Sequence, residues 1–144
     1  MEDTFNIDLS ALEQWFDNHL GGHQGITIEP IKGGGSCELF SIQRGANRWA
    51  MRRAPLNTVS SSAHDVLREF AIINAMQGVG LPVPTVLAAQ DRGAITDAAF
   101  YIMEYIDGEV IRHGLPKQYI ASPATQVVIG EQLIDALVEL HNFE

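Results

Sequence analysis

Residues 49–53 read Trp-Ala-Met-Arg-Arg within a predicted strand over residues 48–53. Side chains alternate between the two faces of a strand, so we expect Ala50 and Arg52 on one face. The other face then takes Trp49, Met51 and Arg53. A small residue two positions before a basic one suits a nucleotide, because alanine leaves room for a flat base and the cation reaches the phosphates. The alternative is that both arginines are solvated charges at a strand end.

In the protein-kinase pattern, a glutamate on the helix after this strand pairs with the basic residue of the strand, so a partner for Arg52 is expected there. The predicted N-cap of this helix is Ser62, with Asp65 favourably placed in the first turn, and glycines from Gly78 onward end it. Glu69 lies beside the apolar stripe of this helix, where a carboxylate needs a partner. The sequence therefore predicts an Arg52–Glu69 pair; the alternative is a solvated helix glutamate.

A glycine-rich run, Lys32-Gly33-Gly34-Gly35-Ser36, separates the first two predicted strands. Glycines let the backbone approach a ligand closely and point N–H groups at an anion. We therefore take Gly34, Gly35 and Ser36 as candidate nucleotide-loop residues. The alternative is an ordinary hairpin turn.

The run from Phe100 to Gly108 is a predicted strand that leads into a polar turn at Asp107. It resembles a kinase hinge, in which backbone groups bind the edge of the base. On that interpretation Met103 guards the back of the pocket, and the backbones of Glu104 and Ile106 bind the base. The alternative is a core strand followed by a hairpin turn.

The order of predicted elements indicates an α+β fold with a five-stranded antiparallel sheet and a helix packed on it. An amphipathic N-terminal helix is expected over residues 8–20, where Ser10 and Glu13 resemble a capping box. A C-terminal helix is expected to start at Ser122-Pro123 and to run to about His141. The five strands are expected at residues 26–31, 38–43, 48–53, 85–90 and 98–106. We predict one unit over residues 1–106 and a linker with a further helix over 107–144.

Composition limits the partners of the chain. Its net charge of −9 disfavours nucleic acid and anionic membranes as partners, because the chain would repel phosphate groups. No stretch approaches the roughly 20 apolar residues of a membrane span. The single cysteine, Cys37, fits a reducing compartment, and the N-terminus does not read as a signal peptide, so a cytoplasmic location is expected.

Together these segments resemble the aminoglycoside phosphotransferase and choline kinase superfamily, which is protein kinase-like. The resemblance is closest to the branch found as stand-alone bacterial phosphotransferases and fused to some acyl-CoA dehydrogenases. It implies that Arg52 binds phosphate, that Glu69 is its partner and that Ser36 lies in the nucleotide loop. Cys37 stands where this branch often has asparagine. The matching segments are residues 33–36, 49–55, 63–70, 81–84, 100–108 and 140–141.

The resemblance also implies ATP or GTP as the phosphoryl donor, with Mg²⁺ in a full-length parent. The family's catalytic aspartate comes from a His-Gly-Asp-type loop, and no such tripeptide occurs in these 144 residues. We therefore expect the N-terminal lobe of a small-molecule phosphotransferase that is catalytically incomplete as given. The alternative is a non-catalytic kinase-like binding or assembly module. The last helix is apolar beyond one stripe, so residues 123–143 are expected to meet a larger lobe or to self-associate.

Overall fold

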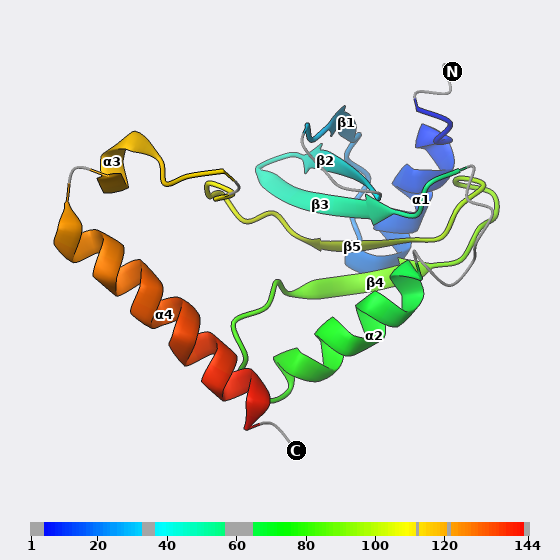
Figure 1. Ribbon diagram of the computed structural model, residues 1–144. Coiled ribbons are helices and arrows are strands. Elements are labelled where there is room, and N and C mark those ends of the chain that lie inside the picture. The colour runs from blue at the N-terminus through cyan, green and yellow to red at the C-terminus, as the bar shows by residue number, and fades with distance from the viewer. Residues whose placement is uncertain (1–4, 33–36, 57–64, 112, 121, 143–144) are drawn as a thin grey trace.

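The computed structural model of the protein describes residues 5–32, 37–56, 65–111, 113–120 and 122–142. Its elements follow the predicted order of helix, three strands, helix, two strands and C-terminal helix (Figure 1). They are α1 (Leu9–Leu20), β1 (Thr27–Pro30), β2 (Glu38–Arg44), β3 (Asn47–Arg53), α2 (Val66–Gln77), β4 (Val86–Gln90), β5 (Phe100–Glu104), α3 (Lys117–Ile120) and α4 (Pro123–His141). The short helix α3 was not predicted.

The five strands form one antiparallel sheet in the order β1-β2-β3-β5-β4, which confirms the predicted fold class. β3 is the central strand. Ala50 on β3 lies opposite Ser41 on β2 and opposite Met103 on β5. Arg52 lies opposite Leu39 and Tyr101 in the same way. This register brings residues distant in the sequence into two neighbouring rows across one face of the sheet.

Helix α1 covers the other face of the sheet. Its buried side chains Leu12, Trp15 and Phe16 join a core cluster with strand residues of the opposite parity from Ala50 and Arg52. The strand members include Phe40, Ile42, Met51, Phe100 and Ile102. Because burial of these side chains removes apolar area from water, this face supplies most of the driving force for folding. We call it the covered face.

Helix α2 packs on the face that carries Arg52. A smaller core cluster there contains Cys37, Val66, Val86 and Tyr101, with Met103 partly buried against it. The helix starts later than predicted. Its N-cap is Asp65, whose Oδ1 accepts a hydrogen bond of 2.9 Å from the amide of Arg68, whereas the predicted cap, Ser62, lies outside the described residues. We call this the open face, because α2 covers only part of it (Figure 1).

The start of α1 also differs from the prediction. Asp8 is the N-cap, and its Oδ1 accepts a hydrogen bond of 3.0 Å from the amide of Ala11. The expected capping box at Ser10 and Glu13 does not form; the Glu13 carboxylate instead accepts the amide of Ile26, at 3.1 Å. Asp and Ser are both good caps, and apolar periodicity alone does not choose between them.

Helix α4 begins as predicted, with Ser122 as its N-cap and Pro123 in its first turn. The segment after β5 leads away from the sheet to α3, and α4 runs back so that its C-terminal end lies beside that of α2 (Figure 1). An apolar cavity of about 210 Å³ separates α4 from the end of α2 and the connector Leu81–Val83. No α4 side chain is buried. No helix in the described ranges is long and apolar enough to cross a membrane.

Candidate functional site

The open face carries the predicted ion pair between β3 and α2. Arg52 Nε donates to Glu69 Oε2 at 2.6 Å, and Arg52 Nη2 donates to Glu69 Oε1 at 3.0 Å. This two-point geometry fixes the plane of the guanidinium as well as its position. The Arg52 side chain remains 27% exposed and that of Glu69 41% exposed, so the pair borders solvent.

Tyr101 is the third member of this group and was not among the predicted site residues. Its hydroxyl donates to Glu69 Oε2 at 3.3 Å from β5, while the residue is only 2% exposed. Strand parity is the signal that identifies it, because Tyr101 lies two positions before Met103 and therefore shares its face. Glu69 is thus held by an arginine from one strand and a phenol from the next.

The electrostatics of this group favour one protonation state. Burial lowers the pKa of Arg52, but the hydrogen bond and the charge of Glu69 outweigh it, so the pKa lies above its ordinary value. Burial, and then the negative charge of Glu69, raise the pKa of Tyr101 well above its ordinary value. The arginine therefore stays charged and the phenol stays protonated as a donor to Glu69.

Ala50 and Met103 occupy the middle of the open face. They are directly opposite each other in the sheet register, one row away from Arg52 and Tyr101. Ala50 is buried and adds only a methyl group to this row. The structure therefore places a small residue between the ion pair and the segment after β5, as the spacing in the sequence indicated.

The segment after β5 carries the two residues whose backbones were predicted to bind the base. The amide of Glu104 donates to the carbonyl oxygen of Thr85, at 2.8 Å, so the carbonyl is the backbone group of Glu104 that can contact a ligand. β5 ends at Glu104 rather than at residue 106, and Ile106 is 60% exposed. In the described part of the chain no backbone partner is found for the Ile106 amide. One acceptor and one donor therefore remain at this edge.

The predicted loop residues Gly34, Gly35 and Ser36 lie outside the described residues. The first described residue after them, Cys37, is buried in the α2-side cluster. Its electrostatic influence on Arg52 places it in the neighbourhood of the ion pair. The chain therefore enters β2 next to Arg52, although the loop itself is not described.

Arg48 extends the open face on the side away from Arg52. Its Nε donates to Ser41 Oγ at 2.8 Å, and its Cζ lies 3.7 Å from the centroid of the Tyr105 ring. The guanidinium therefore lies across β3, between β2 and the segment after β5. Arg48 was not among the predicted site residues, although it shares the parity of Ala50 and Arg52.

Arg53 lies on the covered face and is only 1% exposed. Its Nε and Nη2 donate to Glu38 Oε2 at 3.0 and 2.8 Å, and its Nη1 donates to Thr96 Oγ1 at 3.0 Å. The same Nη1 donates to the carbonyl oxygens of Phe5 and Asn6, at 2.9 and 3.3 Å. The alternative that Arg52 and Arg53 are solvated charges is therefore wrong for both residues.

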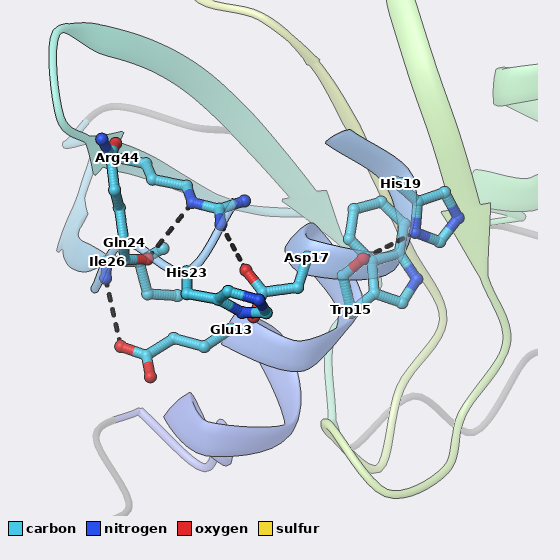
Figure 2. Close-up of polar contacts among 8 residues, drawn as sticks. All are labelled: Glu13, Trp15, Asp17, His19, His23, Gln24, Ile26 and Arg44. Carbon is cyan, nitrogen blue, oxygen red and sulfur yellow. Dashed lines mark hydrogen bonds and ion pairs between the residues drawn. The ribbon is translucent and has the colours of Figure 1, made fainter. Parts of the chain in front are cut away.

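A second arginine of the covered face, Arg44, anchors the loop after α1 (Figure 2). Its guanidinium forms an ion pair with Asp17 through Nη2 and donates from Nε to the carbonyl oxygen of Gln24, at 3.2 Å. His23 lies beside the same carboxylate in Figure 2, and its Nδ1 is 3.1 Å from Asp17 Oδ2. A cavity of about 430 Å³ opens beside Arg44. Since Arg44 is engaged by Asp17 and Gln24, we assign it an anchoring role.

The described residues hold no group of three or more histidine, cysteine, aspartate or glutamate side chains that suits a metal ion. The carboxylate nearest to the candidate site, Glu69, is already bound by Arg52 and Tyr101. The described part of the chain therefore has groups that can contact a phosphate and a base, but no set of free carboxylates that could bind a cation.

Comparisons with known proteins give consistent matches. A model of the phosphotransferase enzyme family matches residues 27–144. The rat protein acyl-CoA dehydrogenase family member 11 (Rattus norvegicus) is 30% identical over 144 residues, covering 96% of this chain and 18% of that protein. The mouse protein acyl-CoA dehydrogenase family member 10 (Mus musculus) is 29% identical over 143 residues, covering 98% of this chain and 13% of that protein.

Among solved structures, a candidate aminoglycoside phosphotransferase from Ralstonia eutropha JMP134 matches with a TM-score of 0.61 and 28% identity. The match covers 74% of this chain and 30% of that one. The chain thus spans less than a fifth of the two curated relatives, at 18% and 13% of their lengths. What it shares with them is therefore one part of a longer polypeptide.

Proposed function

Because the chain belongs to the phosphotransferase enzyme family, we propose that it is the nucleotide-binding lobe of a small-molecule phosphotransferase domain. The observation that supports this best is the two-point Arg52–Glu69 pair, on the same sheet face as Ala50 and one row away from it. The fixed Arg52 guanidinium can bind the phosphates of a nucleotide, and the neighbouring small residue Ala50 leaves room for its base.

In this proposal each group has a separate task. Arg52 contacts the phosphates, and Glu69 and Tyr101 hold its guanidinium in orientation. Ala50 and Met103 line the base site, while the Glu104 carbonyl and the Ile106 amide face the edge of the base. Gly34, Gly35 and Ser36 would supply backbone donors to the phosphates. The donor nucleotide is ATP or GTP.

The chemistry of phosphoryl transfer needs further groups besides those of the proposed nucleotide site. Phosphoryl transfer requires a residue that orients the acceptor hydroxyl and carboxylates that hold Mg²⁺. The sequence contains no His-Gly-Asp tripeptide, and the described residues contain no metal cluster. We propose that residues 1–106 form the nucleotide lobe, that residues 107–144 begin a larger lobe, and that the parent domain completes the site. The chain itself then binds nucleotide without transferring phosphate.

A nucleotide titration followed by calorimetry or thermal shift tests the proposal. ATP and GTP are each added with Mg²⁺ to the wild-type chain, to Arg52→Ala and to Arg92→Ala. Arg92 is an exposed cation on the loop after β4, so its removal matches the charge change without touching the site. We expect weak binding that Arg52→Ala abolishes and Arg92→Ala retains. Equal binding by all three proteins would contradict the proposed site.

A second candidate function, a non-catalytic binding or assembly module, is favoured by the surface of α4. Large apolar side chains there are exposed, among them Val127 at 59%, Leu133 at 64% and Ile134 at 61%. Exposed apolar patches of this kind mark association surfaces. The partner is either the larger lobe or a second copy that meets residues 123–143. We place the protein in the cytoplasm, with neither nucleic acid nor membrane as a partner.

Light scattering over a concentration series separates the two kinds of partner for α4. Self-association predicts a mass that rises with concentration and falls back to the monomer in Leu133→Glu. Ile72→Glu, on an exposed position of α2, is the matched control and should not change the mass. A monodisperse monomer at high concentration would rule out self-association and leave the larger lobe as the partner.

A further inference from the structure

Arg48 differs from the other arginines of β2 and β3 in its partners. Arg44, Arg52 and Arg53 each form an ion pair with a carboxylate. Within the described part of the chain, Arg48 has no carboxylate within ion-pair distance. Among the arginines of β2 and β3, Arg48 is thus the one whose charge no described carboxylate neutralises. It leaves a positive charge available to a ligand on the open face.

The Arg48 side chain is nevertheless held in place. The hydrogen bond from Nε to Ser41 Oγ fixes one side of the guanidinium, and its stacking on Tyr105 fixes the plane. Ser41 lies directly opposite Ala50 in the register, so the guanidinium reaches the Ala50 row. These two contacts engage Nε and the face of the guanidinium, which leaves the Nη donors for other contacts.

The backbone groups at the hinge do not by themselves choose a base. The Glu104 carbonyl and the Ile106 amide offer one acceptor and one donor. Adenine pairs with them through its 6-amino group and N1, whereas a 6-oxopurine pairs through N1–H and O6. A side chain next to this edge must therefore distinguish adenine from a 6-oxopurine. Among the described residues of the open face, Arg48 and Arg52 are the cations held in place by side-chain contacts, and Arg48 is the one beside this edge.

On these grounds we propose that Arg48 selects the base and that the site prefers 6-oxopurine nucleotides, an inference that rests on the proposed function. The N–H groups of a guanidinium donate hydrogen bonds to the O6 and N7 acceptors of a 6-oxopurine. Adenine carries a 6-amino group in place of O6, and because that group is itself a donor, it cannot accept a hydrogen bond from the guanidinium. One charge-assisted hydrogen bond at an exposed site corresponds to about a tenfold preference. Tyr105 acts as the positioning residue for Arg48.

The test is a set of nucleotide titrations by NMR with GTP, ITP and ATP, each with Mg²⁺. ITP keeps O6 and lacks the 2-amino group of GTP, so it isolates the contact to O6. We expect the wild-type chain to bind GTP and ITP about tenfold more tightly than ATP. In Arg48→Met the ratio should fall to about one, with ATP binding little changed. Arg48→Lys keeps the charge without the planar fork and should give an intermediate ratio.

Two controls separate the possible failures. Arg92→Met removes an exposed cation far along the sequence from the site and should leave the ratio unchanged. Tyr105→Leu removes the stacking platform and should lower the ratio while Arg48 is still present. A ratio that is the same in Arg48→Met and the wild type would overturn this inference alone. Absence of binding by all three nucleotides would overturn both it and the proposed function.

Discussion

The two faces of the central sheet use the same residue type in opposite ways. On the covered face, Arg44 and Arg53 are buried and bound to carboxylates and backbone carbonyls of the chain. On the open face, Arg48 and Arg52 stay partly accessible, and only some of the N–H donors of each are engaged. Adjacent positions on a strand face opposite sides of the sheet. A shift of one position therefore decides whether an arginine is buried and stabilises the fold or remains available to a ligand.

The cause is what lies over each face. The covered face meets α1 and the N-terminal segment around Phe5 and Asn6, whose carbonyls are turned toward Arg53. The open face meets α2 over the Tyr101 and Val86 side only. A buried charge is tolerated where every donor finds an acceptor, whereas an exposed one needs only to be oriented. The following predictions test this contrast, from the largest effect to the smallest.

The largest expected effect is the loss of apolar packing on the covered face. Phe16→Ala removes a fully buried ring that also contacts Trp49, so we expect about 4 kcal/mol of lost unfolding free energy. Phe70→Ala, on α2, removes a half-buried ring packed on Tyr101 and should cost about 1–2 kcal/mol. Chemical denaturation of both variants gives the comparison. Equal losses would mean that the two faces contribute equally.

The next effect separates the neighbouring arginine roles directly. Arg53→Met leaves Glu38, Thr96 and two backbone carbonyls without their donor, so we expect a loss of about 3 kcal/mol. Arg48→Met breaks one hydrogen bond and one exposed stacking contact and should cost less than about 1 kcal/mol. Urea denaturation at neutral pH measures both. A larger loss for Arg48→Met would reverse the assignment of the two faces.

The smallest effect concerns Tyr101, which holds Glu69 from β5. Tyr101→Phe removes one hydrogen bond to a carboxylate, and we expect a loss of about 1 kcal/mol near neutral pH. Nucleotide affinity should fall modestly as well, because Glu69 then orients Arg52 less firmly. Stability is measured by denaturation, and Tyr119→Phe on α3 is the control, away from the sheet.

The pH dependence of stability gives a separate readout for Tyr101. Its folded-state pKa is raised, so above the ordinary value of 10.0 the unfolded chain loses this proton while the folded chain retains it. Stability contributed by the protonated phenol is therefore present below pH 10.0 and declines as the pH rises further. We expect Tyr101→Phe to flatten this alkaline decline. An unchanged slope would show that other groups cause it.

Much of the fold could be read from the sequence, because its signals are local. Apolar periodicity located α1 and α2, alternation and glycine-rich turns located the strands, and Ser122-Pro123 located the start of α4. The helix starts were less certain. Asp8 and Asp65 compete with nearby serines as caps, and the choice depends on how the chain enters the helix. The short helix α3 has too few residues for a periodic signal.

The candidate site was predicted in part for a similar reason. Ala50, Arg52 and Glu69 were found because strand parity and helix position are properties of short segments. Tyr101 and the Arg48–Tyr105 stack were missed, because they depend on the register of β3 with β5 and not on any single motif. Which backbone group of Glu104 could face a ligand was also not readable from the sequence, because its amide pairs with Thr85 on another segment of the chain.

The sequence by itself determined the order of the elements, the alternation that separates Arg52 from Arg53, and the small residue between the arginines of the open face. Only the tertiary structure decided which face α1 would cover, and thus which arginine would be buried. The physical reason is that parity is set by the geometry of one strand. Burial instead depends on which distant segments pack against each face, and those contacts exist only once the chain has folded.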